Sequence, residues 1–209
     1  AQNMVKVEEK TGVKLMIGHI ERFNPVVAKL VELVKTNKTG EILTLSSRRI
    51  GPYDPRVRDV GIIIDSATHD IDIMNYILRE KPVMVFARSL IKKHSKEDHA
   101  FIVLDYAKSV GAIEVNWFMP YKMRNLIVTG TERVIEIDYI KQEMKIYDEK
   151  CIHIPAIKRE EPLKLEIEHF IESVSKNKEP LTSSLDALNV LKIAIAAVES
   201  NKKRSAVFI

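Results

Sequence analysis

The most constraining feature of the sequence is a block of short, closely spaced apolar segments between Val83 and Ile154. The segments are rich in β-branched and aromatic residues, and turns of a few residues separate them, such as Ala107–Ser109. Connections this short leave no room for crossover helices, so the sheet should be largely antiparallel. The expected strands are Val83–Ile91, Phe101–Tyr106, Val110–Phe118, Met123–Thr129, Val134–Ile140 and Met144–Tyr147.

Segments with helical spacing of apolar residues flank this block on both sides. Strands in one block with helices around them predict an α+β fold: a large, mostly antiparallel open sheet with flanking helices. Two helix starts have recognisable caps, Asn24 before Pro25 and Ser183 with Asp186 three residues later. The expected helices are Pro25–Thr36, about Ser66–Leu78, Leu163–Lys176 and Ser184–Asn201, with further strands at Ile42–Ile50 and Ala206–Ile209.

The first 18 residues have a different character. Gln2–Lys10 resembles the tail of a helix that Gly12 ends, and Val13–Ile17 is an expected apolar strand. A lone helix and strand make a poor beginning for a domain, and the first methionine is Met4, so Ala1 need not be the native start. We therefore expect residues 1–18 to be the end of a larger unit, and residues 19–209 to form the α+β domain.

Composition excludes several classes of protein. Apolar residues make up 45% of the 209 positions, but no apolar run approaches the roughly 20 residues that span a bilayer. Cys151 is the only cysteine, which excludes an intramolecular disulfide and favours a reducing, cytoplasmic location. The net charge of +4 comes from interleaved signs, so we expect no nucleic-acid partner. Cys151 and His153 have a spacing found in metal sites, but no second pair of ligands follows, so no metal is expected.

The most informative stretch for chemistry runs from Asp65 to Asp72. If a helix begins at Asp65 or Ser66, residues four or three apart share a face. Asp65 could then orient the imidazole of His69, and opposing effects of the carboxylate and the helix N-terminus would leave its pKa near neutrality. Alternatively, Asp65 is a helix cap and His69 an ordinary first-turn residue. The polar face would hold Asp65, His69, Asp72 and Tyr76, and the apolar stripe Ala67, Ile71, Met74 and Leu78.

A second cluster lies between Gly18 and Pro25, in the loop after the expected strand. In open α/β sheets, ligands bind beyond the carboxyl ends of the strands, where His19 and Arg22 would lie. The forked donors of Arg22 could hold an anionic or hydroxyl-rich substrate. A structural ion pair of Arg22 with Glu21 or Asp65 is equally open.

Together, these clusters resemble the Gfo/Idh/MocA family, the glucose–fructose oxidoreductases and inositol dehydrogenases. His19–Pro25, after Gly18, resembles the family's G-H-x-x-R-F-x-P, and Gly61–Asp72 resembles its G-x-x-x-D-x-x-x-H-D-x-D. Arg124–Asp138 resembles its strand–Gly-Thr–strand hairpin, and Leu163–Ser200 its closing helix pair. The resemblance covers nearly the whole chain.

The resemblance implies an N-terminal Rossmann domain that binds NAD or NADP, followed by a substrate-binding and oligomerising domain. Residues 1–18 would be the last helix and strand of a truncated Rossmann domain. The glycine fingerprint and the catalytic Glu-Lys-Pro of the family do not occur in this chain, so the chain alone is expected to be inactive.

The family's residue roles transfer to matching positions. His69 would be the general base that takes a proton from a sugar hydroxyl while hydride passes to nicotinamide, and Asp65 would orient it and contact substrate. Trp117 could equally be a packed sheet aromatic. Cofactor contacts would come from His19, Ile20 and Arg22, and substrate contacts from Arg22, Tyr121 and Trp117.

The leading hypothesis is therefore the catalytic domain of an NAD(P)-dependent sugar or nucleotide-sugar dehydrogenase. The variant Glu21–Pro25 resembles members that act on nucleotide sugars, such as UDP-N-acetylglucosamine 3-dehydrogenases. One alternative is a non-catalytic fragment for ligand binding or oligomerisation, and another is a metal-dependent lyase or isomerase. Strands such as Phe101–Leu104 and Gly111–Phe118 are apolar on both faces, which predicts a homo-oligomer through the open sheet face.

Overall fold

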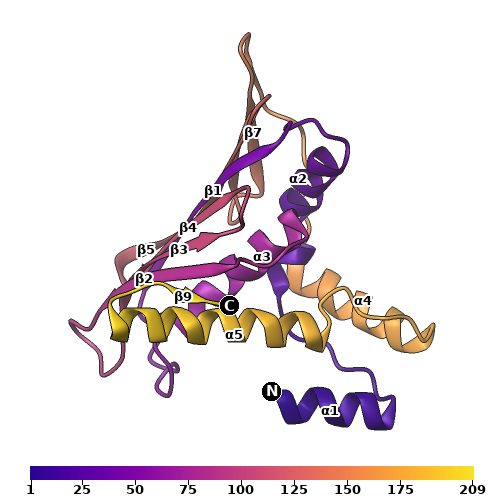
Figure 1. The fold of residues 1–209 in the computed structure, drawn as a ribbon. Coiled ribbons are helices and arrows are strands. Elements are labelled where there is room, and N and C mark those ends of the chain that lie inside the picture. The colour runs from indigo at the N-terminus through magenta and orange to yellow at the C-terminus, as the bar shows by residue number, and fades with distance from the viewer.

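A nine-stranded sheet forms the centre of the computed structural model, which describes residues 1–209 (Figure 1). Its spatial order is β8-β7-β6-β5-β1-β4-β3-β2-β9. Neighbouring strands are antiparallel, except that β1 and β4 run parallel. The strands are β1 Ile42–Pro52, β2 Met84–Leu90, β3 His99–Asp105, β4 Val110–Asn116, β5 Phe118–Gly130, β6 Val134–Asp138, β7 Glu143–Tyr147, β8 Ile152–His153 and β9 Val207–Phe208.

Helices α2, α3 and α5 pack against the sheet, and the core lies between them and its inner face (Figure 1). Inward residues of the strands, such as Leu45, Ile113 and Leu126, are completely buried there. No helix combines the length and apolar character that a membrane crossing requires. The helices are α1 Gln2–Thr11, α2 Pro25–Lys35, α3 Thr68–Leu78, α4 Pro162–Ser175 and α5 Ser184–Lys203, with a 3-10 turn η1 Ile20–Phe23 and a π turn η2 Ile63–Ala67. This architecture confirms the predicted fold class.

The opposite face of the sheet is open. Along β3, Ile102 and Leu104 point into the core, whereas Phe101 and Val103 are 52% and 39% exposed. Ala112 of β4 lies opposite Val103 in the register, so the open face continues across both strands. The period of two along a strand explains why one set of apolar side chains is covered and the other is not.

The two predicted helix caps form. The side chain of Asn24 accepts a hydrogen bond from the backbone nitrogen of Val26 at 3.3 Å, and that of Ser183 accepts one from Asp186 at 3.1 Å. Each cap satisfies a backbone donor that the first helical turn leaves unpaired. The helices therefore begin where the sequence predicts.

The strand expected over Val13–Ile17 does not form. Met16 makes only an isolated bridge with Ser183, supported by a 3.2 Å hydrogen bond from the backbone nitrogen of Ile17 to the carbonyl of Thr182. No neighbouring strand accompanies this segment, and without a partner its apolar pattern cannot build a ladder. The segment leads from α1, none of whose residues is buried, to η1.

Candidate active site

A cavity of about 440 Å³ opens where the first turn of α3 faces the ends of β1 and β4. These two strands are the parallel pair of the sheet, so their carboxyl ends meet at the same edge. Ligands of α/β sheets bind at such an edge. The lining comes from Arg49, Ile50, Gly51, Pro52, Tyr53, Asp54, Pro55, Val57, Asp65, Ser66, His69, Asn116, Trp117, Lys122 and Arg124.

His69 enters this cavity from α3. Its Nδ1 atom is buried and has no hydrogen-bond partner in the protein. Burial lowers the pKa of His69 to about 3, and charge interactions with Arg49, His19 and Arg124 lower it further. The near-neutral pKa expected from the sequence was therefore wrong, because desolvation and nearby cations both disfavour the charged ring. The imidazole is neutral at physiological pH.

Asp65 lines the same cavity but does not orient His69. Its carboxylate accepts a hydrogen bond from the hydroxyl of Ser66 at 2.7 Å, and no hydrogen bond joins it to the imidazole. Asp65 lies in the π turn η2, whereas His69 lies in α3. A π turn closes hydrogen bonds between residues five apart, so residues four apart no longer stack as in an α-helix. The structure thus brings both residues to the cavity without the predicted contact.

A buried ion network lies beneath the cavity. Arg49 donates from Nε to Asp70 at 2.7 Å and from Nη1 to Glu21 at 3.1 Å, and Arg124 lies 3.6 Å from Glu21. The network joins β1, η1, α3 and β5, and all its members except Arg124 are buried. This network was not predicted from the sequence. One pattern in the sequence points to it: Arg49 lies two residues after Ser47 and four after Leu45, on the side of β1 that faces the core. A buried charge at such a position requires a partner.

Arg22 belongs to a different part of the structure. Its guanidinium binds Asp72 through two hydrogen bonds of 2.9 and 2.6 Å, Asp186 at 3.1 Å and the carbonyl of Leu181 at 2.7 Å. It also lies over the ring of Tyr76, 4.7 Å from its centroid. Arg22 is buried and lines a separate cavity of about 530 Å³. Arg22 therefore forms structural ion pairs, and its partners are Asp72 and Asp186 rather than the expected Glu21 and Asp65.

His19 and Ile20 flank the site without sharing its cavity. The buried ring of His19 meets that of His69 edge to face, with centroids 6.4 Å apart. Its Nε2 atom lies 3.9 Å from Asp72 and has no hydrogen-bond partner, and burial lowers its pKa. His19 lines an apolar cavity of about 230 Å³ between α1 and α5. Ile20 lines another cavity, beside Arg124.

The two predicted sheet aromatics differ in position. Trp117 lines the His69 cavity and packs with Tyr53 and His94, whose rings are stacked with centroids 3.7 Å apart. Tyr121 of β5 is 57% exposed and does not contribute to the cavity lining. The cavity thus has an aromatic wall beside a cationic one, formed by Arg49, Lys122 and Arg124. Such a wall pair suits a ring-shaped, hydroxyl-rich or anionic ligand.

Comparisons with known proteins agree with this architecture. A sequence model of the oxidoreductase family's C-terminal α/β domain matches residues 31–209. The chain is 22% identical to UDP-N-acetylglucosamine 3-dehydrogenase of Acidithiobacillus ferrooxidans, over 98% of this chain and 68% of that protein. It is 27% identical to scyllo-inositol 2-dehydrogenase (NAD+) of Bacillus subtilis (93% and 62%) and 28% identical to inositol 2-dehydrogenase of Rhizobium meliloti (94% and 65%).

Solved structures show the same fold. The UDP-N-acetylglucosamine 3-dehydrogenase of Acidithiobacillus ferrooxidans superposes with a TM-score of 0.87 at 20% identity, over 97% of this chain and 66% of that one. An aldose-aldose oxidoreductase of Caulobacter crescentus complexed with glycerol gives 0.90 at 18% identity, over 100% and 68%. This chain spans 62–68% of the length of the three sequence relatives above.

Proposed function

The chain belongs to the Gfo/Idh/MocA oxidoreductase family as its C-terminal α/β domain, and we propose that it is the substrate-binding and catalytic domain of an NAD(P)-dependent sugar or nucleotide-sugar dehydrogenase. The observation that carries this proposal is the buried Nδ1 atom of His69, which has no protein partner and belongs to a residue that lines a polar cavity. Similarity to polyol and nucleotide-sugar dehydrogenases supports the substrate class.

In this proposal His69 is the general base. A neutral imidazole has a free lone pair, and no protein group occupies Nδ1. The ring can therefore accept a proton from a substrate hydroxyl that lies within hydrogen-bond distance. Asp65 lines the same cavity and contacts the substrate's other hydroxyls, rather than orienting the base.

The cations around His69 act on the oxygen that loses its proton. Arg49 and Arg124 line the cavity and lower the pKa of His69 through their charges. The same positive field favours negative charge that develops on the substrate oxygen in the transition state. Arg49 is fixed by Asp70 and Glu21, so this field is preorganised. Lys122 and Arg124 also favour substrates with an anionic group, such as a nucleotide sugar.

This chain offers a contact only for the nicotinamide end of the cofactor. His19 offers a buried, unpartnered Nε2 beside an apolar cavity, which suits contact with the nicotinamide ring. Arg22 does not fit the predicted cofactor role, because Asp72, Asp186 and Leu181 engage its donors. When bound, the nicotinamide accepts the hydride. We propose that residues 1–18 close a Rossmann domain that holds the rest of the cofactor, and that residues 19–209 form the substrate domain.

The test is a dehydrogenase assay on the longest translated product that contains this chain, with inositols, aldoses and UDP-N-acetylglucosamine. His69→Asn should lower kcat at least about 100-fold with a small change in KM, since a general base contributes roughly 10²–10⁴-fold. The matched control is His99→Gln, whose side chain lies on the open face of β3. Circular dichroism checks that both variants fold.

The outcomes separate the two candidate functions. Normal turnover by His69→Asn refutes the assignment of the base. Binding of a sugar to the cavity without any turnover supports the non-catalytic alternative. Binding can be followed on the 209-residue chain itself by NMR shifts of cavity residues such as Trp117.

We also propose that the open sheet face mediates self-association. Phe101, Val103 and Ile127 are each more than a third exposed on that face, and exposed apolar patches of this kind mark interfaces. A closed homo-oligomer would bury them. Light scattering that shows a monomer at micromolar concentration would contradict this proposal.

A further inference from the structure

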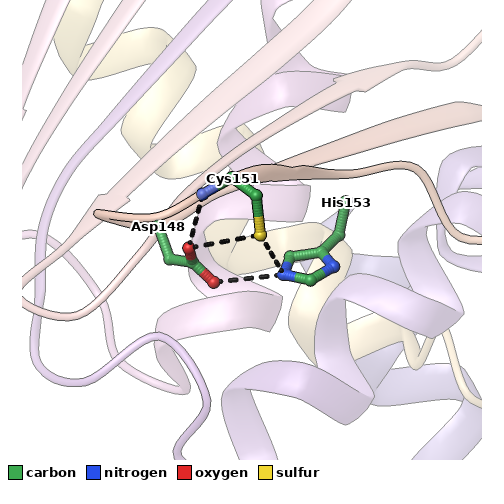
Figure 2. A group of neighbouring side chains, drawn as sticks. All are labelled: Asp148, Cys151 and His153. Atoms are coloured by element: carbon green, nitrogen blue, oxygen red, sulfur yellow. Dashed lines mark hydrogen bonds and ion pairs between the residues drawn. The ribbon is translucent and has the colours of Figure 1, made fainter.

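Three metal-binding side chains meet in the hairpin between β7 and β8, at the edge of the sheet (Figure 2). Asp148 follows the last residue of β7, Cys151 ends the turn and His153 lies on β8. Figure 2 shows the thiol, the carboxylate and one imidazole nitrogen turned toward a common point. Within this hairpin the sequence indicated Cys151 and His153, and the turn brings Asp148 to them as a third ligand.

The three ligand atoms lie close enough together to share one ion, and the Sγ–Nε2 and Nε2–Oδ2 distances are slightly shorter than those of a formed zinc site. Cys151 Sγ lies 3.1 Å from His153 Nε2, which lies 3.2 Å from Asp148 Oδ2, and Sγ lies 3.7 Å from Asp148 Oδ1. Tetrahedral zinc, with bonds of about 2.3 Å to sulfur and 2.0–2.2 Å to nitrogen and oxygen, places its ligand atoms roughly 3.3–3.7 Å apart. We propose that Asp148, Cys151 and His153 form a Zn²⁺ site with an open fourth position for water.

The geometry distinguishes a metal site from a nucleophilic triad. In a Cys-His-Asp relay, the imidazole faces the thiol with one nitrogen and the carboxylate with the other. Here His153 Nε2 faces both Cys151 and Asp148. One nitrogen cannot accept the thiol proton and donate to the carboxylate at the same time. A cation at the common point instead satisfies the lone pairs of all three ligands.

The carboxylate is positioned by its own turn. Asp148 Oδ1 accepts hydrogen bonds from the backbone nitrogens of Lys150 at 3.0 Å and Cys151 at 3.1 Å, which orients the group while Oδ2 faces His153. Such outer contacts are typical of metal ligands. Arg133 lies 4.0 Å from Oδ2 and is the cation that the metal would have to displace. The mixture of sulfur, nitrogen and oxygen donors favours zinc over magnesium or calcium.

The site lies at the edge of the sheet, away from the active-site cavity. β8 pairs with β7 through only two residue pairs, Ile146–His153 and Tyr147–Ile152. Strands β7, β6 and β5 separate it from β1, which carries Arg49 of the active-site cavity. Zinc here would fasten the edge strand to the turn, independently of the proposed dehydrogenase chemistry.

The test is zinc titration of the 209-residue chain by calorimetry, after treatment with a chelator and in the presence of a non-chelating reductant. We expect one Zn²⁺ per chain, and Co²⁺ should give a thiolate-to-cobalt absorption band. Cys151→Ser and His153→Gln should each lower the affinity at least about 100-fold, since loss of even an outer-shell partner costs roughly 10–100-fold. Cys151→Ser should also abolish the band.

Glu149→Gln is the matched control, because it removes a carboxylate from the same turn without removing a ligand. Unchanged binding by this variant supports the proposal. The proposal is overturned if the parent chain binds less than one Zn²⁺, if the cobalt band persists in Cys151→Ser, or if Glu149→Gln weakens binding as much as the ligand variants. These hairpin side chains are half-buried or exposed, and circular dichroism verifies that each variant keeps its fold.

Discussion

Two histidines of this protein lie in opposite surroundings. His69 lines a cavity with cations around it, and its Nδ1 atom has no partner. His153 is 57% exposed in its side chain, and its Nε2 atom faces both a carboxylate and a thiol. The same imidazole therefore lies in two different environments: the first disfavours the charged ring, and the second places one ring nitrogen beside a thiol and a carboxylate.

The difference shows that charge and burial decide the chemistry of a histidine more than its sequence neighbours do. Both histidines follow an aspartate by four or five residues. In the hairpin the aspartate reaches the ring, whereas at the cavity the π turn directs Asp65 to Ser66. Arg49 then dominates the electrostatics of His69 from a strand 20 residues away in the sequence.

The largest expected effect is the loss of unfolding free energy when Arg49, the buried cation beside the cavity, is replaced. Arg49→Met leaves Asp70 without its ion pair and removes one of the two cations beside Glu21. Breaking a buried pair in this way costs about 3–5 kcal/mol, because a buried charge is left uncompensated. Urea denaturation of the chain, followed by circular dichroism, measures the loss of unfolding free energy.

Arg48 provides the matched control. It precedes Arg49 on β1 but points to the open face, where it donates to Glu114 at 2.7 Å with half of its side chain exposed. Arg48→Met should cost about 1 kcal/mol or less, as is usual for surface pairs. Equal losses in the two variants would show that the buried network does not hold the cavity together.

The local elements of the fold could be predicted because their causes are local. The inward positions Ile71 and Met74 of α3 and the cap at Asn24 depend on adjacent residues, and both agree with the structure. The parallel pairing of β1 with β4 was not predicted, because 57 residues lie between the two strands and tertiary packing chooses the partner. The strand predicted over Val13–Ile17 does not form for a related reason. Its apolar pattern is compatible with a strand, but no strand of this chain lies beside it.

The site was predictable only where a motif marks it. His69 and Trp117 do line one cavity, whereas Tyr121 does not. The partners of Arg49 could not be predicted, because its carboxylates come from η1 and α3 and meet it only in the folded chain. Arg22 was open to two interpretations, and its ion pair with Asp72 could not be predicted from sequence spacing. Spacing identifies candidate residues, but three-dimensional contacts decide what those residues do.

The smaller expected effect concerns the pH dependence of stability, in chelator-containing buffer. The unfolded chain binds a proton at His69 below about pH 6.5, whereas burial and cations keep the folded ring neutral until about pH 3. The unfolded state thus binds more protons between these values, so stability falls as pH falls from 6.5 to 3. His69→Gln should reduce the pH dependence of the unfolding free energy by the contribution of one proton, at most about 1.4 kcal/mol per pH unit.

The hairpin supplies the comparison at lower pH. Backbone hydrogen bonds from Lys150 and Cys151 lower the pKa of Asp148 to about 2, so its contribution is present above the ordinary aspartate pKa and is lost as pH falls toward 2. Between pH 6.5 and about 5, the unfolding free energy of Asp148→Asn should therefore change with pH as that of the parent does. The unfolding free energy of His69→Gln should change less steeply with pH in the same range. If the unfolding free energy of His69→Gln instead had the same pH dependence as that of the parent, His69 would be solvated and able to bind a proton in the folded chain. The electrostatic environments of His69 and His153 would then not differ in the way described above.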